Sequence, residues 1–123
     1  MAKKHGARFL AFCEAAKSRI PEVTVRQAME MMKSRPDVIM VDVREESEWS
    51  AGHIHGAIHL GKGVIERDIE KAIPDVDTVL VLYCGGGYRS ALAADALHGM
   101  GYHHAVSMAG GWKAWLADDG PTD

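Results

Sequence analysis

One segment of the sequence combines a nucleophile with a backbone that is able to surround an anion. It runs Cys84-Gly85-Gly86-Gly87-Tyr88-Arg89. Cysteine thiols are largely protonated at neutral pH, so a nucleophilic cysteine needs groups that stabilise its thiolate. Glycines lack a Cβ, so they adopt positive φ angles and let successive backbone N–H groups point at a bound anion. The segment therefore predicts a reactive Cys84 within a loop of inward-facing amides.

The elements on either side of this loop would place Cys84 at the edge of a sheet. Residues 78–83, Thr-Val-Leu-Val-Leu-Tyr, follow a turn-forming segment and predict a strand at the sheet centre. The alanine- and leucine-rich stretch after Ser90 predicts a helix to Met100 that ends at Gly101. Open α/β sheets bind ligands beyond the carboxyl ends of their strands. The predicted position of Cys84, first after a strand and close to a helix N-terminus, is therefore one where ligands bind.

The remaining pattern alternates helices with short buried strands and indicates an α/β domain. Residues 24–34 begin with a capping box and predict a helix. The apolar run after Pro36 predicts a buried strand over residues 38–42. Residues 104–107 predict another short strand, and residues 112–117 predict a last short helix.

The composition limits the class of protein. The chain has 123 residues, of which 47% are hydrophobic and 25% charged, which is typical of one globular domain. No apolar run approaches the roughly 18 residues that span a bilayer, so we expect no membrane partner. The formal net charge of -3 argues against nucleic acid as a partner. The two cysteines match no zinc-site spacing and no disulfide framework, which favours the reducing cytoplasm.

The N-terminal residues have a superficial similarity to a secretory signal. Residues 9–12, Phe-Leu-Ala-Phe, follow basic residues, but Glu14 interrupts the apolar stretch too soon. We therefore expect an amphipathic opening helix. Cys13 would lie in that helix, either packed in the core or acting as a resolving thiol for Cys84, and its apolar neighbours favour packing.

Three segments, in the expected order, resemble the signatures of the rhodanese family. They are residues 41–60 (VDVREESEWSAGHIHGAIHL), residues 84–90 (CGGGYRS) and residues 110–115 (GGWKAW). The resemblance implies a rhodanese-like α/β domain over residues 20–117, with a five-stranded, mainly parallel sheet and helices on both faces. It leaves residues 1–19 as an N-terminal helical extension. Residues 118–123 form a polar C-terminal tail, for which we expect disorder.

The resemblance also implies an activity, that of a sulfurtransferase of the thiosulfate:cyanide type. Cys84 would take a sulfane sulfur from a small donor such as thiosulfate or mercaptopyruvate and become a persulfide. It would then pass the outer sulfur to cyanide, a thiol or a protein acceptor. No cofactor and no metal are expected. The residues implied to bind the thiolate and persulfide through their backbone N–H groups are Gly85, Gly86, Gly87, Tyr88 and Arg89.

The side chains of the loop leave the donor open. Arg89 either steers an anionic donor or pairs with a carboxylate at the start of the helix. Family members with basic residues at the second, third and fifth loop positions suit an inorganic anion, but those positions hold Gly85, Gly86 and Tyr88 here. Tyr88 would offer an aromatic wall and a hydroxyl to an organic donor.

Other chemistry-bearing residues are better explained as structural. Asp42, Arg44 and Glu48 match family positions that pair a strand end with neighbouring loops. The three histidines of residues 53–59 have a spacing that suggests a metal site, but no cysteine or carboxylate nearby completes a ligand set.

Two other classes of protein stay open. Phosphatases and arsenate reductases of the same fold also use a loop cysteine and arginine. Their catalytic loop is one residue longer than the four residues between Cys84 and Arg89, which favours sulfur over phosphate. Non-catalytic interaction modules of the family usually lack the cysteine that is present here.

Overall fold

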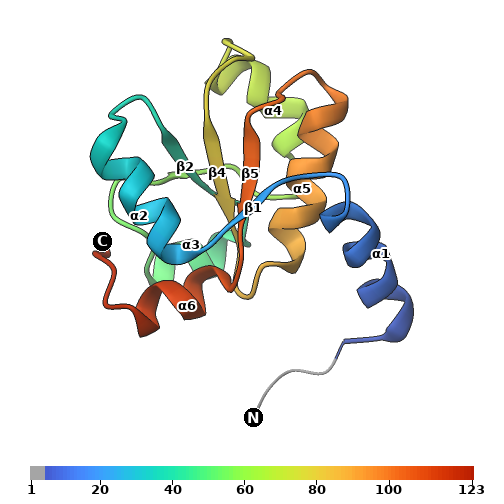
Figure 1. Cartoon of the computed structure of the whole chain (residues 1–123), viewed down its shortest axis with the longest axis horizontal. Coiled ribbons are helices and arrows are strands. Elements are labelled where there is room, and N and C mark those ends of the chain that lie inside the picture. The colour runs from blue at the N-terminus through green and yellow to red at the C-terminus, as the bar shows by residue number, and fades with distance from the viewer. Residues whose placement is uncertain (1–4) are drawn as a thin grey trace.

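The computed structural model describes residues 5–123, which form a parallel sheet between two layers of helices (Figure 1). Residues 1–4 of the predicted N-terminal extension lie outside the described part of the chain. In chain order the elements are α1 (Ala7–Lys17), β1 (Glu22–Val23), α2 (Val25–Ser34), β2 (Ile39–Asp42), α3 (Glu46–Ala51), β3 (Ile58–His59), α4 (Ile65–Ala72), β4 (Leu80–Tyr83), α5 (Tyr88–Gly99), β5 (Ala105–Met108) and α6 (Gly111–Ala117).

The five strands have the order β1-β5-β4-β2-β3, and every pairing between them is parallel. Leu80 and Leu82 of the central β4 face one core cluster, which contains residues of α4 and α5. Val81 and Tyr83 face the other cluster, with residues of α2 and α6. Burial on both faces explains why this strand is continuously apolar. The predicted fold class, a five-stranded parallel sheet with helices on both faces, is confirmed (Figure 1).

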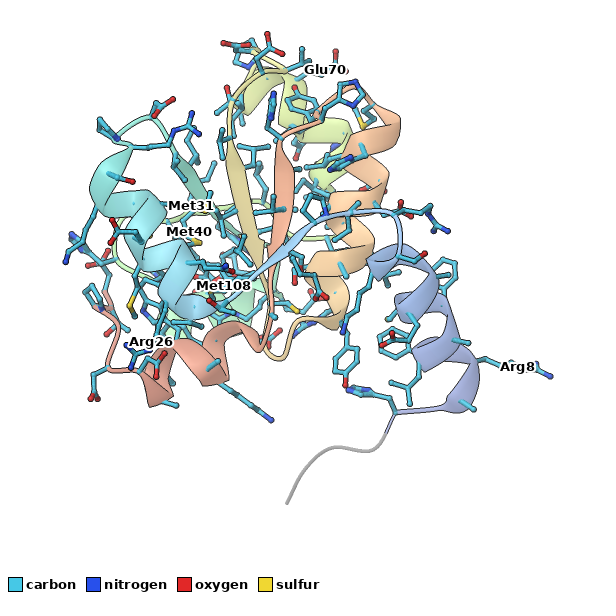
Figure 2. All side chains as sticks on the ribbon, in the orientation of Figure 1. Arg8, Arg26, Met31, Met40, Glu70 and Met108 are labelled. Atoms are coloured by element: carbon cyan, nitrogen blue, oxygen red, sulfur yellow. The ribbon has the colours of Figure 1, made fainter. Side chains whose placement is uncertain are left out.

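Helix α2 begins at the predicted capping box. The Gln27 N–H donates to Thr24 Oγ1 at 3.1 Å, and the Thr24 N–H donates to Gln27 Oε1 at 2.8 Å. The helix covers its face of the sheet largely with methionine. Met31 of α2 packs against the cluster that holds Met40 and Met108 of the sheet (Figure 2).

Helix α1 lies against α5, outside the sheet (Figure 1). Cys13 and Ala16 are fully buried in this contact. Just beyond the helix, Arg19 donates to the Asp95 carboxylate of α5 at 2.7 and 2.9 Å. The helix is therefore fixed to the domain by packing and by an ion pair. No helix within residues 5–123 is long and apolar enough to cross a membrane.

The strand β4 begins two residues later than the sequence pattern predicts. Thr78 belongs instead to the preceding turn, because its hydroxyl donates to the Asp75 carbonyl at 2.8 Å. The Asp75 carboxylate also accepts the Asp77 N–H at 2.9 Å. A β-branched threonine fits a strand, but these local hydrogen bonds compete with the sheet.

The expectation of a disordered C-terminal tail is wrong. Thr122 forms an antiparallel bridge with Ile54, and the Asp123 carboxylate accepts from His55 at 2.7 Å. The Trp115 indole N–H donates to the Pro121 carbonyl at 3.0 Å. The tail is ordered because its backbone and the side-chain carboxylate of Asp123 find partners in the segment after α3.

Candidate active site

The cysteine lies where the central strand meets the Gly-rich loop. Cys84 directly follows β4, and its Sγ accepts a hydrogen bond from the Gly87 N–H at 3.1 Å. Gly87 has a φ of +99°, in the left-handed region that favours glycine. Gly85 and Gly86 have no such angle. The left-handed turn at Gly87 thus brings a backbone donor onto the sulfur at the N-terminus of α5.

The first turn of α6 holds this loop from the other side. The Trp112 N–H donates to the Cys84 carbonyl at 2.7 Å, and the Lys113 N–H donates to the Gly85 carbonyl at 3.2 Å. A Cβ at Gly111 would lie 2.9 Å from the Gly85 carbonyl group and closer still to the Cys84 carbonyl oxygen. Segment 110–115, known from the sequence only by resemblance, therefore supports the backbone of the cysteine loop.

Two serines extend the contacts of the sulfur into the core. Ser90 Oγ lies 3.4 Å from Cys84 Sγ and 2.8 Å from Ser107 Oγ. Both serines are fully buried. Sequence reasoning did not single them out, although a serine inside the apolar run of β5 is a signal of a buried polar contact. The chain of hydroxyls gives the thiol a second polar neighbour.

Arg89 pairs with a carboxylate from a distant helix. Its guanidinium donates to both oxygens of Glu48 in α3, at 2.7 and 3.1 Å. The hydrogen bonds from Arg89 lower the pKa of Glu48 from 4.5 to about 2. Of the two interpretations of Arg89, the geometry favours pairing, with a partner on α3 rather than at the start of α5.

The other charged residues singled out in the sequence hold the neighbouring strand end. Arg44 donates to the Asp42 carboxylate at 2.7 Å and to the Gly52 carbonyl at 2.7 Å, and both side chains of the ion pair are buried. Each of the three histidines contacts other residues of the fold, and His53 and His59 both stack on Trp49. The His53 ring stacks on Trp49 at 3.4 Å, His55 binds the C-terminal residue, and His59 Nε2 lies 2.8 Å from the Arg44 carbonyl. These contacts fit a structural role for the charged residues at the strand end and for the three histidines.

Cys13 is packed in the core rather than positioned for reaction. Its Sγ is buried, 4.0 Å from the Tyr88 carbonyl oxygen. Burial raises the pKa of the Cys13 thiol, which opposes formation of a nucleophilic thiolate. The geometry therefore favours core packing over a resolving role.

A cavity of about 690 Å³ lies over the loop. Most of the predicted site residues line it, namely Cys84, Gly85, Gly86, Tyr88 and Arg89. Gly87 lies behind them with its N–H on the sulfur. The lining residues that the sequence did not identify as parts of a site are His5, Phe9, Glu45, Glu48 and Lys113. They come from segments far apart in the chain, so no local pattern indicated them.

The fold and the loop define a class of small parallel α/β domains with a cysteine at the carboxyl edge of the central strand. Within that class the chain belongs to the rhodanese-like family, because the model of the rhodanese-like domain matches residues 24–118. The chain is 34% identical over 100 residues to thiosulfate sulfurtransferase GlpE of Pseudomonas putida, covering 81% of this chain and 88% of the relative.

Solved structures agree with this assignment. The polysulfide-sulfur transferase homodimer of Wolinella succinogenes superposes with a TM-score of 0.82 at 27% identity, covering 95% of this chain and 88% of that one. A protein of unknown function from Rhodopseudomonas palustris, described as a possible tyrosine phosphatase, has a TM-score of 0.87 at 31% identity and covers 100% of this chain and 99% of its own. The family and the named transferases support a sulfurtransferase.

Proposed function

We propose that this protein is a sulfurtransferase that carries a sulfane sulfur on Cys84 as a persulfide. The observation that carries the proposal is the position of Cys84, a buried residue that lines the cavity over the loop and whose Sγ accepts the Gly87 N–H at 3.1 Å. A backbone N–H aimed at sulfur stabilises the thiolate, which is the nucleophilic form. The N-terminus of α5 adds a favourable potential for the same charge.

The reaction has two balanced steps. The Cys84 thiolate attacks the outer sulfur of thiosulfate, the new S–S bond forms, and sulfite leaves with the electron pair of the broken bond. The persulfide then gives its outer sulfur to an acceptor thiolate or to cyanide, and the Cys84 thiolate is regenerated. In this proposal the N–H groups of Gly85 through Arg89 hold the charge on the outer sulfur in the intermediate. No cofactor or metal takes part.

The partners follow from the same chemistry. The donor is a small molecule of the thiosulfate or mercaptopyruvate class, and the acceptor is cyanide, a low-molecular-weight thiol or a protein thiol. A free catalytic thiol suits the reducing cytoplasm, which we propose as the compartment. Residues 20–117 would carry the reaction, with His5 and Phe9 of the N-terminal extension added as a further wall of the cavity.

Mass spectrometry of the intact protein tests the proposal. Incubation with thiosulfate or mercaptopyruvate is expected to add the mass of one sulfur atom at Cys84, and cyanide is expected to remove it as thiocyanate. Cys84→Ser should keep the fold and lose both events, whereas the matched variant Cys13→Ser should keep turnover to within a few fold. Failure of every donor to load Cys84 would favour a non-catalytic interaction module instead.

The Rhodopseudomonas neighbour makes phosphatase chemistry the second candidate. Phosphoryl transfer needs a cation on the equatorial oxygens, and a phosphatase arginine supplies it. Here both ends of the Arg89 guanidinium are bound by Glu48. We expect no measurable hydrolysis of aryl phosphates. Robust phosphatase turnover that depends on Cys84, without any persulfide adduct, would overturn the sulfurtransferase assignment.

A further inference from the structure

The outer wall of the cavity is built from aromatic rings, and two of them come from the N-terminal segment. The His5 ring lies 4.7 Å and the Phe9 ring 6.1 Å from the ring of Tyr88, and the two lie 5.2 Å from each other. We call His5, Phe9 and Tyr88 the aromatic wall. His5 and Phe9 precede the region that matches the rhodanese-like domain, residues 24–118. These two rings are therefore an addition to the matched domain, whereas Tyr88 belongs to it.

Helix α1, which carries Phe9 of the wall, is held in a defined position. Cys13 and Ala16 of α1 are fully buried, and Arg19 just beyond it is paired with Asp95. The labelled Arg8 points away from the domain (Figure 2), while Phe9, the next residue, lines the cavity. Lys17 Nζ lies 4.7 Å from the centre of the Tyr88 ring. The Phe9 ring is thus presented to the cavity by a fixed element.

The charges of the cavity do not select a small, highly charged anion. Among the residues that line it, Glu45 and Glu48 oppose Arg89 and Lys113. Arg89 is already engaged by Glu48, so Lys113 is the cation of this lining that has no ion pair within the described chain. A cavity of about 690 Å³ is also far larger than an inorganic anion requires. Apart from these charged groups, Cys84 and the glycines, the residues that line the cavity are the three of the aromatic wall.

We infer that the aromatic wall selects organic sulfane donors in which a flat apolar group adjoins the transferred sulfur, with aryl thiosulfonates as the representative class. The inference rests on the proposed sulfurtransferase function. The Cys84 thiolate attacks the outer sulfur of R–SO2–S⁻, the S–S bond to Cys84 forms, and the bond to the sulfonyl sulfur breaks. The electron pair leaves with the sulfinate R–SO2⁻. One negative charge enters with the donor and one leaves, so no oxidant or reductant is needed.

A comparison of donors on the full-length protein tests this specificity. Persulfide loading is measured with benzenethiosulfonate and with methanethiosulfonate, and the ratio of their kcat/KM values is compared between variants so that intrinsic reactivity cancels. Phe9→Ala is expected to lower that ratio about tenfold, the size of one lost aromatic contact with its buried area. Phe9→Leu should give an intermediate ratio. Phe12→Ala is the matched control, because Phe12 lies on the same helix but is 62% exposed, and it should leave the ratio unchanged.

An inhibition measurement keeps the test independent of the reactivity of the two donors. Benzenesulfinate, the product of the aryl donor, should inhibit thiosulfate turnover about tenfold more tightly than methanesulfinate, and Phe9→Ala should abolish the difference. Circular dichroism of each variant checks that α1 is retained. An unchanged donor ratio in folded Phe9→Ala, or equal inhibition by the two sulfinates, would overturn the aromatic selection while leaving sulfur transfer in place. Failure of all donors to load Cys84 would instead count against the proposed function itself.

Discussion

The substitution Ser90→Ala separates the role of the buried hydroxyls in stability from their role in chemistry. A thiolate only accepts hydrogen bonds, so in that state the Ser90 hydroxyl donates to Cys84 Sγ, 3.4 Å away, and accepts from Ser107 at 2.8 Å. Both serines are fully buried, so water does not replace a lost partner. The substitution therefore removes one donor from the sulfur and leaves one hydroxyl unpaired.

The two effects have different expected sizes. An unpaired buried hydroxyl at Ser107 costs about 1–3 kcal/mol of unfolding free energy. For a domain of this length we expect the melting temperature to fall by roughly 3–6 °C for each kcal/mol. The contact from Ser90 to sulfur is long, so we assign it about 1 kcal/mol, which corresponds to roughly fivefold slower formation of the persulfide at Cys84.

A double-mutant cycle with Ser107→Ala provides the assay. Thermal unfolding gives the stability of each variant. Mass spectrometry of samples quenched at set times gives the rate of persulfide loading from thiosulfate. The double variant Ser90→Ala/Ser107→Ala should recover most of the stability, because no hydroxyl is left unpaired, yet it should load as slowly as Ser90→Ala. Ser107→Ala alone should load at close to the wild-type rate. Wild-type loading by Ser90→Ala, or a double variant no more stable than Ser90→Ala, would refute the assigned contacts.

Three further substitutions test the support of the loop. Gly111→Ala should lower the free energy of unfolding by more than about 2 kcal/mol and stop loading, because its Cβ would meet the backbone of Cys84; unfolding and loading curves that match the wild type would contradict this. Gly87→Val should slow loading more than it lowers the melting temperature, since a β-branched residue resists a φ of +99° and displaces the N–H from sulfur, and normal loading rates would count against that role. Because the folded-state pKa of Glu48 is lowered from 4.5 to about 2, its pair with Arg89 stabilises the fold above pH 4.5 and is lost as the pH falls toward 2. The free energy of unfolding should therefore fall more steeply with acid in the wild type than in Glu48→Gln, by no more than about 1 kcal/mol for this partly exposed pair. Thermal unfolding at each pH measures the difference, and parallel curves would show that the pair contributes nothing.

The parts of the fold that follow local patterns were predictable from the sequence. The apolar run of β4 predicted a central strand because it is buried on both faces, and residues 24–27 predicted the start of α2 because both partners of the capping box lie within one turn. The position of Cys84 followed from the same reasoning, since the loop joins two elements that are each recognisable alone. Its chemical role and the roles of the loop amides stay predictions that the loading experiments test.

The contacts that complete the site were not predictable, because they join residues far apart in the chain. Arg89 and Glu48 are 41 positions apart, and nothing local to either indicates the other. The same holds for the ordered tail, whose Asp123 binds His55 across 68 positions. A short polar terminus is expected to be disordered only if it finds no partner, and the sequence does not contain that information.

The ion pair between Arg89 and Glu48 also determines which groups are left to stabilise an anion at Cys84. Because the carboxylate occupies both ends of the guanidinium, we expect a sulfur anion at Cys84 to be stabilised mainly by neutral donors, the loop N–H groups and the Ser90 hydroxyl, and by the N-terminus of α5. Neutral donors of this kind match one negative charge on a single atom. A transferring phosphoryl group spreads more charge over three oxygens and needs a free cation at the ring. The pairing of Arg89 with Glu48 and the shortness of the loop therefore both favour a persulfide over a phosphorylated cysteine.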